Sequence, residues 1–355
     1  MSTVIAVVLL LAVVAYAVFG GADFGAGFWD LTAGGAEQGE HPRDTIEHSI
    51  GPVWEANHVW LIFIFVILWT SFPEAYTSIT LTLFVPLAIA ALGIVLRGAS
   101  FAFRKAVVKL GHRRIFGAAF AASSVLVPYC LGAAAGGIAS GRVPAGGQAG
   151  DPVHSWINPT SILSGVLAVA AAAYLASVYL VWDARRLDDT DMIEYFRRRA
   201  VIAAAAVGLI GIIGIFVLRA DAPYLFQGLT SRALPLVIVG ALCGVVALVL
   251  LIRNAPRGAR LLAVVAVAIT MIAWGDAQWP YILPESLTFA AAAAPSGTLT
   301  AMLIVVVLAA LIVIPGFVLL FILDQKGLLP EEGVEDETDV DPAGLRTQAH
   351  KQSNQ

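Results

Sequence analysis

Nine long apolar runs divide this sequence of 355 residues, and they constrain its fold more than any other feature. A helix needs about 20 mostly apolar residues to cross the hydrocarbon layer of a membrane. The runs that meet this requirement lie at about 4–29, 50–70, 76–97, 115–138, 158–182, 200–219, 233–252, 261–279 and 298–323. The sequence therefore predicts an all-α polytopic membrane protein with nine transmembrane helices.

The composition agrees with this class. Hydrophobic residues make up 59% of the chain and charged residues 13%, whereas a soluble domain carries about 25% charged residues. The two cysteines, Cys130 and Cys243, lie inside apolar runs, as expected of buried thiols and not of a disulfide or a metal motif. The first run has no positive charge before it, so we expect a retained span and not a cleaved signal peptide.

The basic residues indicate how the chain lies in the membrane. Eighteen of the 21 Lys and Arg residues, Arg97 among them, fall in or beside one set of alternate connections. Only Arg142, Arg219 and Arg232 fall in the other set. Because positively charged loops stay in the cytoplasm, we predict that the N-terminus lies outside and the C-terminus in the cytoplasm.

A weak internal repeat in the sequence indicates an architecture of two similar halves. The tripeptides FWD at 28–30 and VWD at 181–183 end two predicted spans on the cytoplasmic side, four spans apart. We therefore predict two four-helix repeats, 1–138 and 158–279, that form two bundles, with the ninth helix at 298–323 on the periphery. So short a match also arises by chance.

The end of the chain differs from the rest in composition. Residues 1–326 hold the nine runs and form one predicted transmembrane domain. Residues 327–355 are polar and include the acidic stretch EEGVEDETDVDPAG, with no aromatic residue. Such a segment cannot bury enough apolar surface to fold, so we predict an acidic, disordered cytoplasmic tail.

Ionisable groups inside the apolar runs are candidates for function, since inserting each one costs about 2.5–3.5 kcal/mol. The first run holds Asp23, and the second holds Glu55 and His58. At about 100° per residue, Trp54, Glu55, Asn57 and His58 share one arc of a helix. If the first two spans are antiparallel neighbours, Asp23 and Glu55 lie at similar depth. We interpret Glu55, Asp23 and His58 as proton-path candidates, with Trp54 and Asn57 in support.

Other interpretations of this segment remain. Glu55 and His58 could simply pair with each other, three residues apart on a helix. As a di-iron motif, Glu55-x-x-His58 would need a second such pair, and the sequence has none. As a haem ligand, His58 is the only histidine within a run and would need Met271 or Met302 opposite it. We therefore expect no metal site and no redox centre in this chain.

Small residues and prolines predict how some helices pack and end. Gly21 and Gly25 form a GxxxG pair in the first run, which indicates close approach to a neighbouring helix. Pro280 and Pro284 follow the eighth run and should end its helix. Asp221 and Asp276 lie near the outer ends of two runs, where we expect solvated helix ends.

Three segments resemble subunit II of the cytochrome bd-type quinol oxidases. They are GADFGAGFWDL at 21–31, SIGPVWEANHVWLI at 49–62, and WPYILPESL at 279–287 followed by AAAAPSGTL. The resemblance covers essentially the whole chain. It implies a bacterial inner-membrane subunit of a terminal oxidase that oxidises quinol and reduces O2 to water. It also implies a haem-bearing subunit I as partner, with membrane lipids around the complex and no nucleic acid.

The resemblance also implies where the cofactors lie. Haem b and haem d are expected in subunit I, whereas this chain supports that subunit and lines or flanks a cytoplasmic proton route at Glu55. Some relatives have aspartate at that position and glutamine in place of His58. Some members hold a structural quinone in subunit II, so the resemblance also allows a structural quinone in this chain. The alternatives are a stand-alone proton-coupled secondary transporter and a purely structural partner of subunit I.

Overall fold

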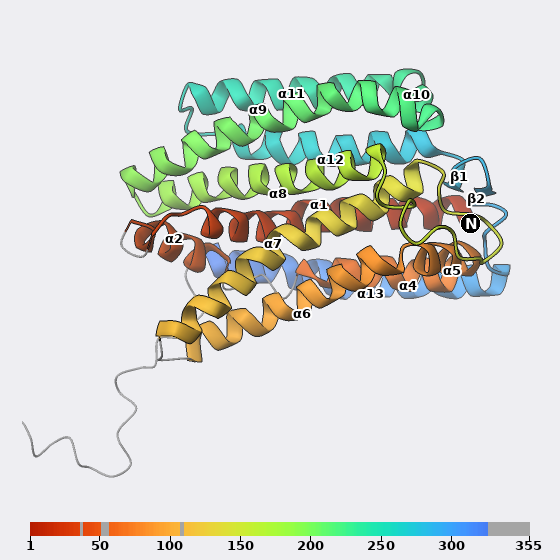
Figure 1. Cartoon of the computed structure of the whole chain (residues 1–355), viewed down its shortest axis with the longest axis horizontal. Coiled ribbons are helices and arrows are strands. Elements are labelled where there is room, and N and C mark those ends of the chain that lie inside the picture. Colours follow the sequence, from red (N-terminus) through yellow and green to blue (C-terminus); the bar gives the residue numbers. More distant parts are fainter. Residues whose placement is uncertain (36–37, 51–56, 107–109, 326–355) are drawn as a thin grey trace, which may run out of the picture.

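The computed structural model of the chain is an elongated bundle of helices that run side by side (Figure 1). It describes residues 1–35, 38–50, 57–106 and 110–325. The helices are α1 (Ser2–Leu31), α2 (Glu40–Ile50), α4 (Val59–Ser71), α5 (Pro73–Thr82), α6 (Phe84–Ala106), α7 (Leu110–Ala139), α8 (Pro159–Arg186), α9 (Thr190–Asp221), α10 (Pro223–Thr230), α11 (Leu234–Ile252), α12 (Ala259–Gln278) and α13 (Ser296–Gln325). Strands β1 (Tyr281–Leu283) and β2 (Leu287–Thr288) form one antiparallel hairpin. The predicted all-α class is confirmed.

Most of these helices can cross a membrane. Within the described residues, seven are long and apolar enough to do so by themselves: α1, α7, α8, α9, α11, α12 and α13. The pair α5 and α6 would make an eighth span, and α4 is a shorter apolar helix of 13 residues. The chain is therefore a multi-span membrane protein, whereas the number nine stays a prediction.

The bundle has two distinct ends (Figure 1). At one end lie the N-terminus of the chain, α5, α10 and the β1–β2 hairpin, and we call this the hairpin end. At the other end lie α2 and the turns from α8 to α9 and from α11 to α12. Eight arginines flank these two turns, and we therefore call this end of the bundle the arginine-rich end. The arginines are Arg185, Arg186, Arg197, Arg198, Arg199, Arg253, Arg257 and Arg260.

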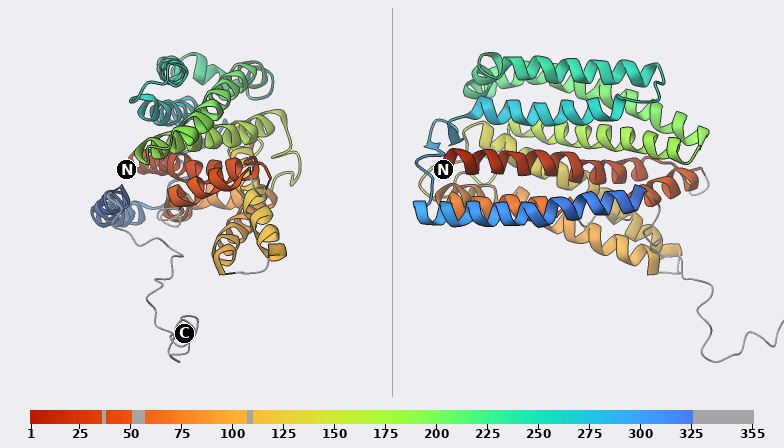
Figure 2. Two further views of the ribbon diagram at one scale, coloured as in Figure 1. Left: turned by 90° about the vertical axis from the view of Figure 1, so that its left-hand side faces the viewer. Right: turned by 180° about the vertical axis from the view of Figure 1, so that it is seen from behind.

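Helix α1 lies at the centre of the bundle. It packs against α7 and α8 and also contacts α4 and α12. Helices α8, α9, α11 and α12 gather on one side of it and α4 to α7 on the other, with α13 along the outside of α4 (Figure 2). This arrangement suits the predicted repeats at 1–138 and 158–279 and the peripheral helix at 298–323, although the division itself stays a prediction.

The small residues of α1 allow α8 to come close. A Cβ atom on Gly25 would lie 1.9 Å from the carbonyl oxygen of Ala172, so only glycine fits there. One turn further on, the Trp29 Nε1 donates a 2.8 Å hydrogen bond to the carbonyl oxygen of Ala173. At Gly21 the space is ordinary, since the nearest atom would be 3.7 Å away. The predicted close approach is confirmed at Gly25.

The third predicted span, 76–97, differs from the structure because it is not one straight helix. Helices α5 and α6 meet at a break with an 84° bend. Pro86 lies in the first turn of α6 and has no N–H to donate to the carbonyl of Thr82, and its ring would clash with that carbonyl in a continuous helix. The freed Thr82 carbonyl instead accepts a hydrogen bond from Ser155 Oγ at 3.4 Å.

The loop that follows α7 is fastened along α5. Three side chains, spaced four residues apart and so on one face of the helix, accept hydrogen bonds from backbone amides of the loop. They are Glu74 from Gly146 at 2.8 Å, Ser78 from Gly147 at 3.1 Å and Thr82 from Gly150 at 2.9 Å. These three hydrogen bonds therefore hold the loop against α5 at the hairpin end of the bundle.

Asp221 corrects the expectation of a solvated helix end. Its carboxylate binds both terminal nitrogens of Arg142, at 2.6 and 3.1 Å, and the hydroxyl and backbone N–H of Thr160. A bidentate pair of this kind is stronger than ordinary neutral hydrogen bonds. It joins α9 to the start of α8. Near the hairpin, α12 ends at Gln278, just before Pro280, as predicted.

Gly25→Ala tests the packing of α1 on α8. We expect the variant to lose about 1–3 kcal/mol of stability, the usual cost of overpacking, because the added methyl meets backbone that cannot turn away. The measurement is the thermal unfolding midpoint of the purified protein in detergent. Gly208→Ala in α9 is the matched control, since a Cβ there meets nothing within 4 Å. Equal midpoints for the two variants would contradict the assigned close approach.

Candidate functional site

A buried hydrogen bond joins the first candidate residue to the segment that holds the others. Asn57 Nδ2 donates to Asp23 Oδ2 at 2.6 Å, and the two residues are only 3% and 4% exposed. Asn57 lies just before α4, which packs against α1. The prediction of similar depth took the neighbouring position of the first two spans as a condition, and this contact shows that α1 and the start of α4 are neighbours. Trp54 and Glu55 lie outside the described residues.

The depth of this contact follows from helix lengths. With 13 residues, α4 is about 20 Å long, which is shorter than the roughly 30 Å hydrocarbon layer. Asp23 precedes the last residue of α1, Leu31, by eight positions, or about 12 Å along the helix. Asn57 and Asp23 therefore meet inside the apolar part of the bundle, nearer the arginine-rich end than the hairpin end.

Arg97 completes this buried cluster, which corrects an expectation. The basic-residue pattern predicts that Arg97 lies in or beside a cytoplasmic connection, whereas it lies within α6 and is 1% exposed. Its Nη2 donates to the backbone carbonyl of Asp23 at 2.8 Å, and its Nη1 donates to Ser124 Oγ in α7. The apolar run was ended too early, because α6 continues beyond Arg97 to Ala106.

Aromatic rings cover the Arg97 guanidinium. Its carbon lies 4.5 Å from the ring centre of Phe120 and 5.1 Å from that of Phe24. Attraction between a desolvated cation and a ring face is worth about 2 kcal/mol. Together with the hydrogen bonds, these rings replace part of the water that the guanidinium loses on burial. We define the polar core as Asp23, Asn57, Arg97 and Ser124.

A glycine makes room for the polar core on α1. A Cβ atom on Gly27 would lie 2.1 Å from Ser124 Oγ and 3.0 Å from Arg97 Nη1. A side chain at position 27 would therefore collide with Ser124 of α7 and with the Arg97 guanidinium. The contact of Gly27 with Ser124 makes the place for Arg97, and neither residue indicates this contact in the sequence.

His58 lies beside the polar core among aromatic side chains. Its Nδ1 is 3.5 Å from the hydroxyl oxygen of Tyr16, and its ring centre is 5.6 Å from that of Phe24. His58 is half-buried. A carboxylate, an imidazole and a phenol, three groups that can carry protons, thus come from α1 and the start of α4 into one region.

The arrangement gives no sign of a metal site in the described part of the chain. No group of three or more His, Cys, Asp or Glu side chains comes together there as metal binding requires. Asn57 Oδ1 and Arg97 Nε are buried without a hydrogen-bond partner among the described residues. Buried polar atoms in proteins usually bond to another protein group or to ordered water.

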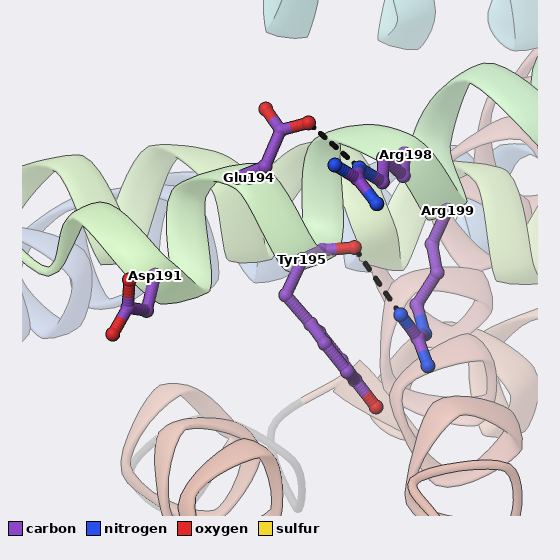
Figure 3. A pocket seen from close by; sticks show the side chains of 5 residues that line it. All are labelled: Asp191, Glu194, Tyr195, Arg198 and Arg199. Atoms are coloured by element: carbon purple, nitrogen blue, oxygen red, sulfur yellow. Dashed lines mark hydrogen bonds and ion pairs between the residues drawn. The ribbon is translucent and has the colours of Figure 1, made fainter.

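A separate hollow of about 300 Å³ lies at the arginine-rich end of α9 (Figure 3). It is lined by Asp191, Glu194, Tyr195, Arg198 and Arg199. Arg198 Nε binds Glu194 Oε1 at 2.7 Å, and Arg199 Nη1 donates to the Tyr195 carbonyl at 3.3 Å. Glu194 in this lining is already paired with Arg198, and the hollow gives no reason to assign a ligand.

Comparisons with known proteins point to one family. The family model described as cytochrome bd terminal oxidase subunit II matches residues 1–323. A putative cytochrome bd menaquinol oxidase subunit II of Bacillus subtilis is 24% identical over 338 residues, covering 89% of this chain and 94% of its own length. Subunit 2 of a cytochrome bd ubiquinol oxidase from the same organism is 30% identical over 147 residues, 41% of this chain and 43% of its own.

A solved structure has the same fold. In the structure of the bd oxidase from Geobacillus thermodenitrificans, one chain superposes with a TM-score of 0.74 at 25% sequence identity. The superposition covers 90% of this chain and 97% of that one. Both the sequence and the arrangement of helices are therefore similar over almost the full length.

Two neighbouring serines of α7 test the polar core. Both hydroxyls donate to the Phe120 carbonyl, but only Ser124 also accepts a hydrogen bond from Arg97. We expect Ser124→Ala to cost about 1–3 kcal/mol more than Ser123→Ala, because it leaves a charged donor buried without its partner. Thermal unfolding of the two purified variants measures the difference. Equal losses would mean that the Arg97 contact contributes nothing to stability.

Proposed function

This chain belongs to the cytochrome bd terminal oxidase subunit II family, and from that premise we propose that it brings protons to the oxygen chemistry of its partner. Membership makes it a membrane subunit of a quinol oxidase, an oxidoreductase that works as a complex of different chains. The proposal concerns how this chain serves the complex. Protons would enter at the arginine-rich end, pass Glu55 and Asp23, and leave for the partner subunit.

The buried bond between Asp23 and Asn57 is the observation that carries the proposal. The bond places the Asp23 carboxylate of α1 against Asn57, inside the apolar part of the bundle. Asn57 follows Glu55 by two residues in the sequence. An ionisable group at such depth is expensive and is usually functional. Arg97 lies close enough to stabilise a negative charge there, while the Tyr16 hydroxyl and His58 supply further proton-carrying groups nearby.

The charge distribution supports a cytoplasmic entry. In the described part of the chain, the three basic residues Arg142, Arg219 and Arg232 belong to the hairpin end, whereas many more arginines lie at the other end. Because basic loops stay in the cytoplasm, the arginine-rich end would face it. The N-terminus would then lie outside and the C-terminus inside the bacterial inner membrane.

The partner would be the haem-bearing subunit I. Haem b and haem d would be bound there, together with the quinol that is oxidised. This chain would contribute no redox centre, and its charged polar core would instead support proton supply. A structural quinone bound by this chain is part of the proposal. A stand-alone transporter is not favoured, because the relatives are oxidase subunits.

Substitution of Glu55 tests its place on the route. We expect Glu55→Gln to lower quinol-driven O2 consumption per haem at least tenfold, because the amide cannot take up a proton. Glu55→Asp should retain most of the rate, since it keeps the carboxylate. Oxygen consumption of the purified complex, normalised to haem absorbance, is the measurement.

The control for this comparison is Glu285→Gln, an equivalent change at an exposed residue of the hairpin end. It should leave turnover unchanged. If Glu55→Gln lowers the yield of the complex but leaves turnover per haem as in the wild type, the chain is a structural partner and the proton route is wrong.

The division of cofactors has its own test. We expect the chain expressed alone to show no haem absorbance, whereas the chain co-purified with its partner should show the bands of haem b and haem d. The visible spectrum of each preparation, per mole of this chain, is measured. Stoichiometric haem on the isolated chain would place a redox centre here and contradict the proposed division.

A further inference from the structure

The turn between α11 and α12 carries three arginines and no acidic residue of its own. Arg253, Arg257 and Arg260 lie within eight residues, and the chain has no Asp or Glu from 222 to 275. At the turn between α8 and α9, by contrast, acidic residues lie between two groups of arginines. Two of these carboxylates are paired: Glu194 with Arg197 and Arg198, and Asp189 with His41.

The turn is held in a fixed shape. Asn254 has a φ of 50°, and the N–H groups of Asn254 and Ala255 close the end of α11 by bonding to the carbonyls of Leu251 and Leu250. This is the Schellman pattern of a helix C-terminus. Arg185 of α8 then binds the Ala255 carbonyl at 2.7 Å and the Asn254 side chain at 2.6 Å. The arginines of the turn therefore project from a rigid base.

Aromatic rings of α8 hold Arg260 in place. Its guanidinium carbon lies 4.6 Å from the ring centre of Tyr179 and 5.5 Å from that of Trp182. Trp182 is itself exposed. Tryptophan and tyrosine beside a cation are typical of the layer where lipid headgroups meet hydrocarbon. Arg253 and Arg257 are exposed, and their side chains make no hydrogen bond or ion pair within the part of the chain that the structure describes.

Directly next to these arginines the surface is apolar. Ile252, the last residue of α11, is 57% exposed, and Leu261, in the first turn of α12, is 67% exposed. Further along α11, Val245 and Val249 are exposed as well. Helix α11 lies at the edge of the bundle, covered by α9, α10 and α12 on one side only (Figure 2).

We propose that Arg253, Arg257 and Arg260 bind the phosphate of an anionic phospholipid whose acyl chains lie along α11 and α12. A free phosphate would use the arginines but not the apolar surface beside them. A zwitterionic lipid would use the apolar surface but would not balance the charge. An anionic phospholipid satisfies both, and each arginine near such a headgroup strengthens binding about fivefold. The inference does not depend on the proposed proton route.

Lipid titration of the purified oxidase complex, followed by native mass spectrometry, tests this site. The probes are dioleoyl phosphatidylglycerol, dioleoyl phosphatidylcholine and inorganic phosphate. We expect Arg257→Gln to weaken phosphatidylglycerol binding about fivefold and the double variant Arg253→Gln, Arg257→Gln about 25-fold. Arg257→Lys should retain most of the affinity, and phosphatidylcholine binding should not change.

The matched control is Arg219→Gln, which removes an exposed arginine from the hairpin end of α9. It should bind phosphatidylglycerol like the wild type. Three results would overturn the proposal: wild-type affinity in the double variant, the same loss in Arg219→Gln, or displacement of the lipid by equimolar inorganic phosphate. Thermal unfolding midpoints equal to that of the wild type show that a loss of binding is not a loss of fold.

Discussion

The rest of the bundle depends on the buried contact between Arg97 and the backbone of α1. A guanidinium inside the apolar layer is stable only if it is hydrogen-bonded and covered, because a buried donor left without its partner costs about 1–3 kcal/mol. Here α1 supplies the Asp23 carbonyl, α7 supplies Ser124, and two phenylalanine rings cover the charge. One side chain of α6 thus fixes three helices at the level where Asp23 meets Asn57.

The position of α1 explains why this contact is possible. On one side its Gly25 lets the backbone of α8 approach, and on the other its Gly27 leaves room for Ser124 and Arg97. A helix with a larger residue at either position could not touch both neighbours. The same stretch of small residues therefore joins the two halves of the bundle and admits the only charged groups of the polar core. Packing and electrostatics are set by the same few positions.

Much of the fold could be predicted from the sequence, and the failures have physical causes. The apolar runs located the membrane helices because their length requirement is strict, and Pro280 marked the end of α12 correctly. Pro86 was overlooked, although it breaks the predicted span 76–97 at Thr82. Arg97 was misplaced because hydropathy treats any arginine at the end of an apolar run as a loop residue. Only the folded structure shows that the Ser124 hydroxyl and the Asp23 carbonyl accept hydrogen bonds from Arg97.

For the candidate site, the sequence indicated which residues to consider but not the bonds between them. Asp23 and His58 were singled out because ionisable groups are rare in the apolar runs, and Asn57 proved to be the residue that contacts Asp23. The role of Glu55 stays a prediction, which rests on its place in an apolar run and on the family resemblance. Its place in the chain, two residues before Asn57, is what connects it with the polar core.

The most direct test of the account is the rate of proton uptake when the fully reduced complex meets O2. A pH-sensitive dye on the arginine-rich side follows uptake, while haem absorbance follows oxidation. In Asp23→Asn, which keeps the shape and an acceptor for Asn57 but cannot carry the proton, we predict uptake at least tenfold slower with the complex still assembled. Uptake at the wild-type rate would contradict the claim that this chain carries protons past Asp23.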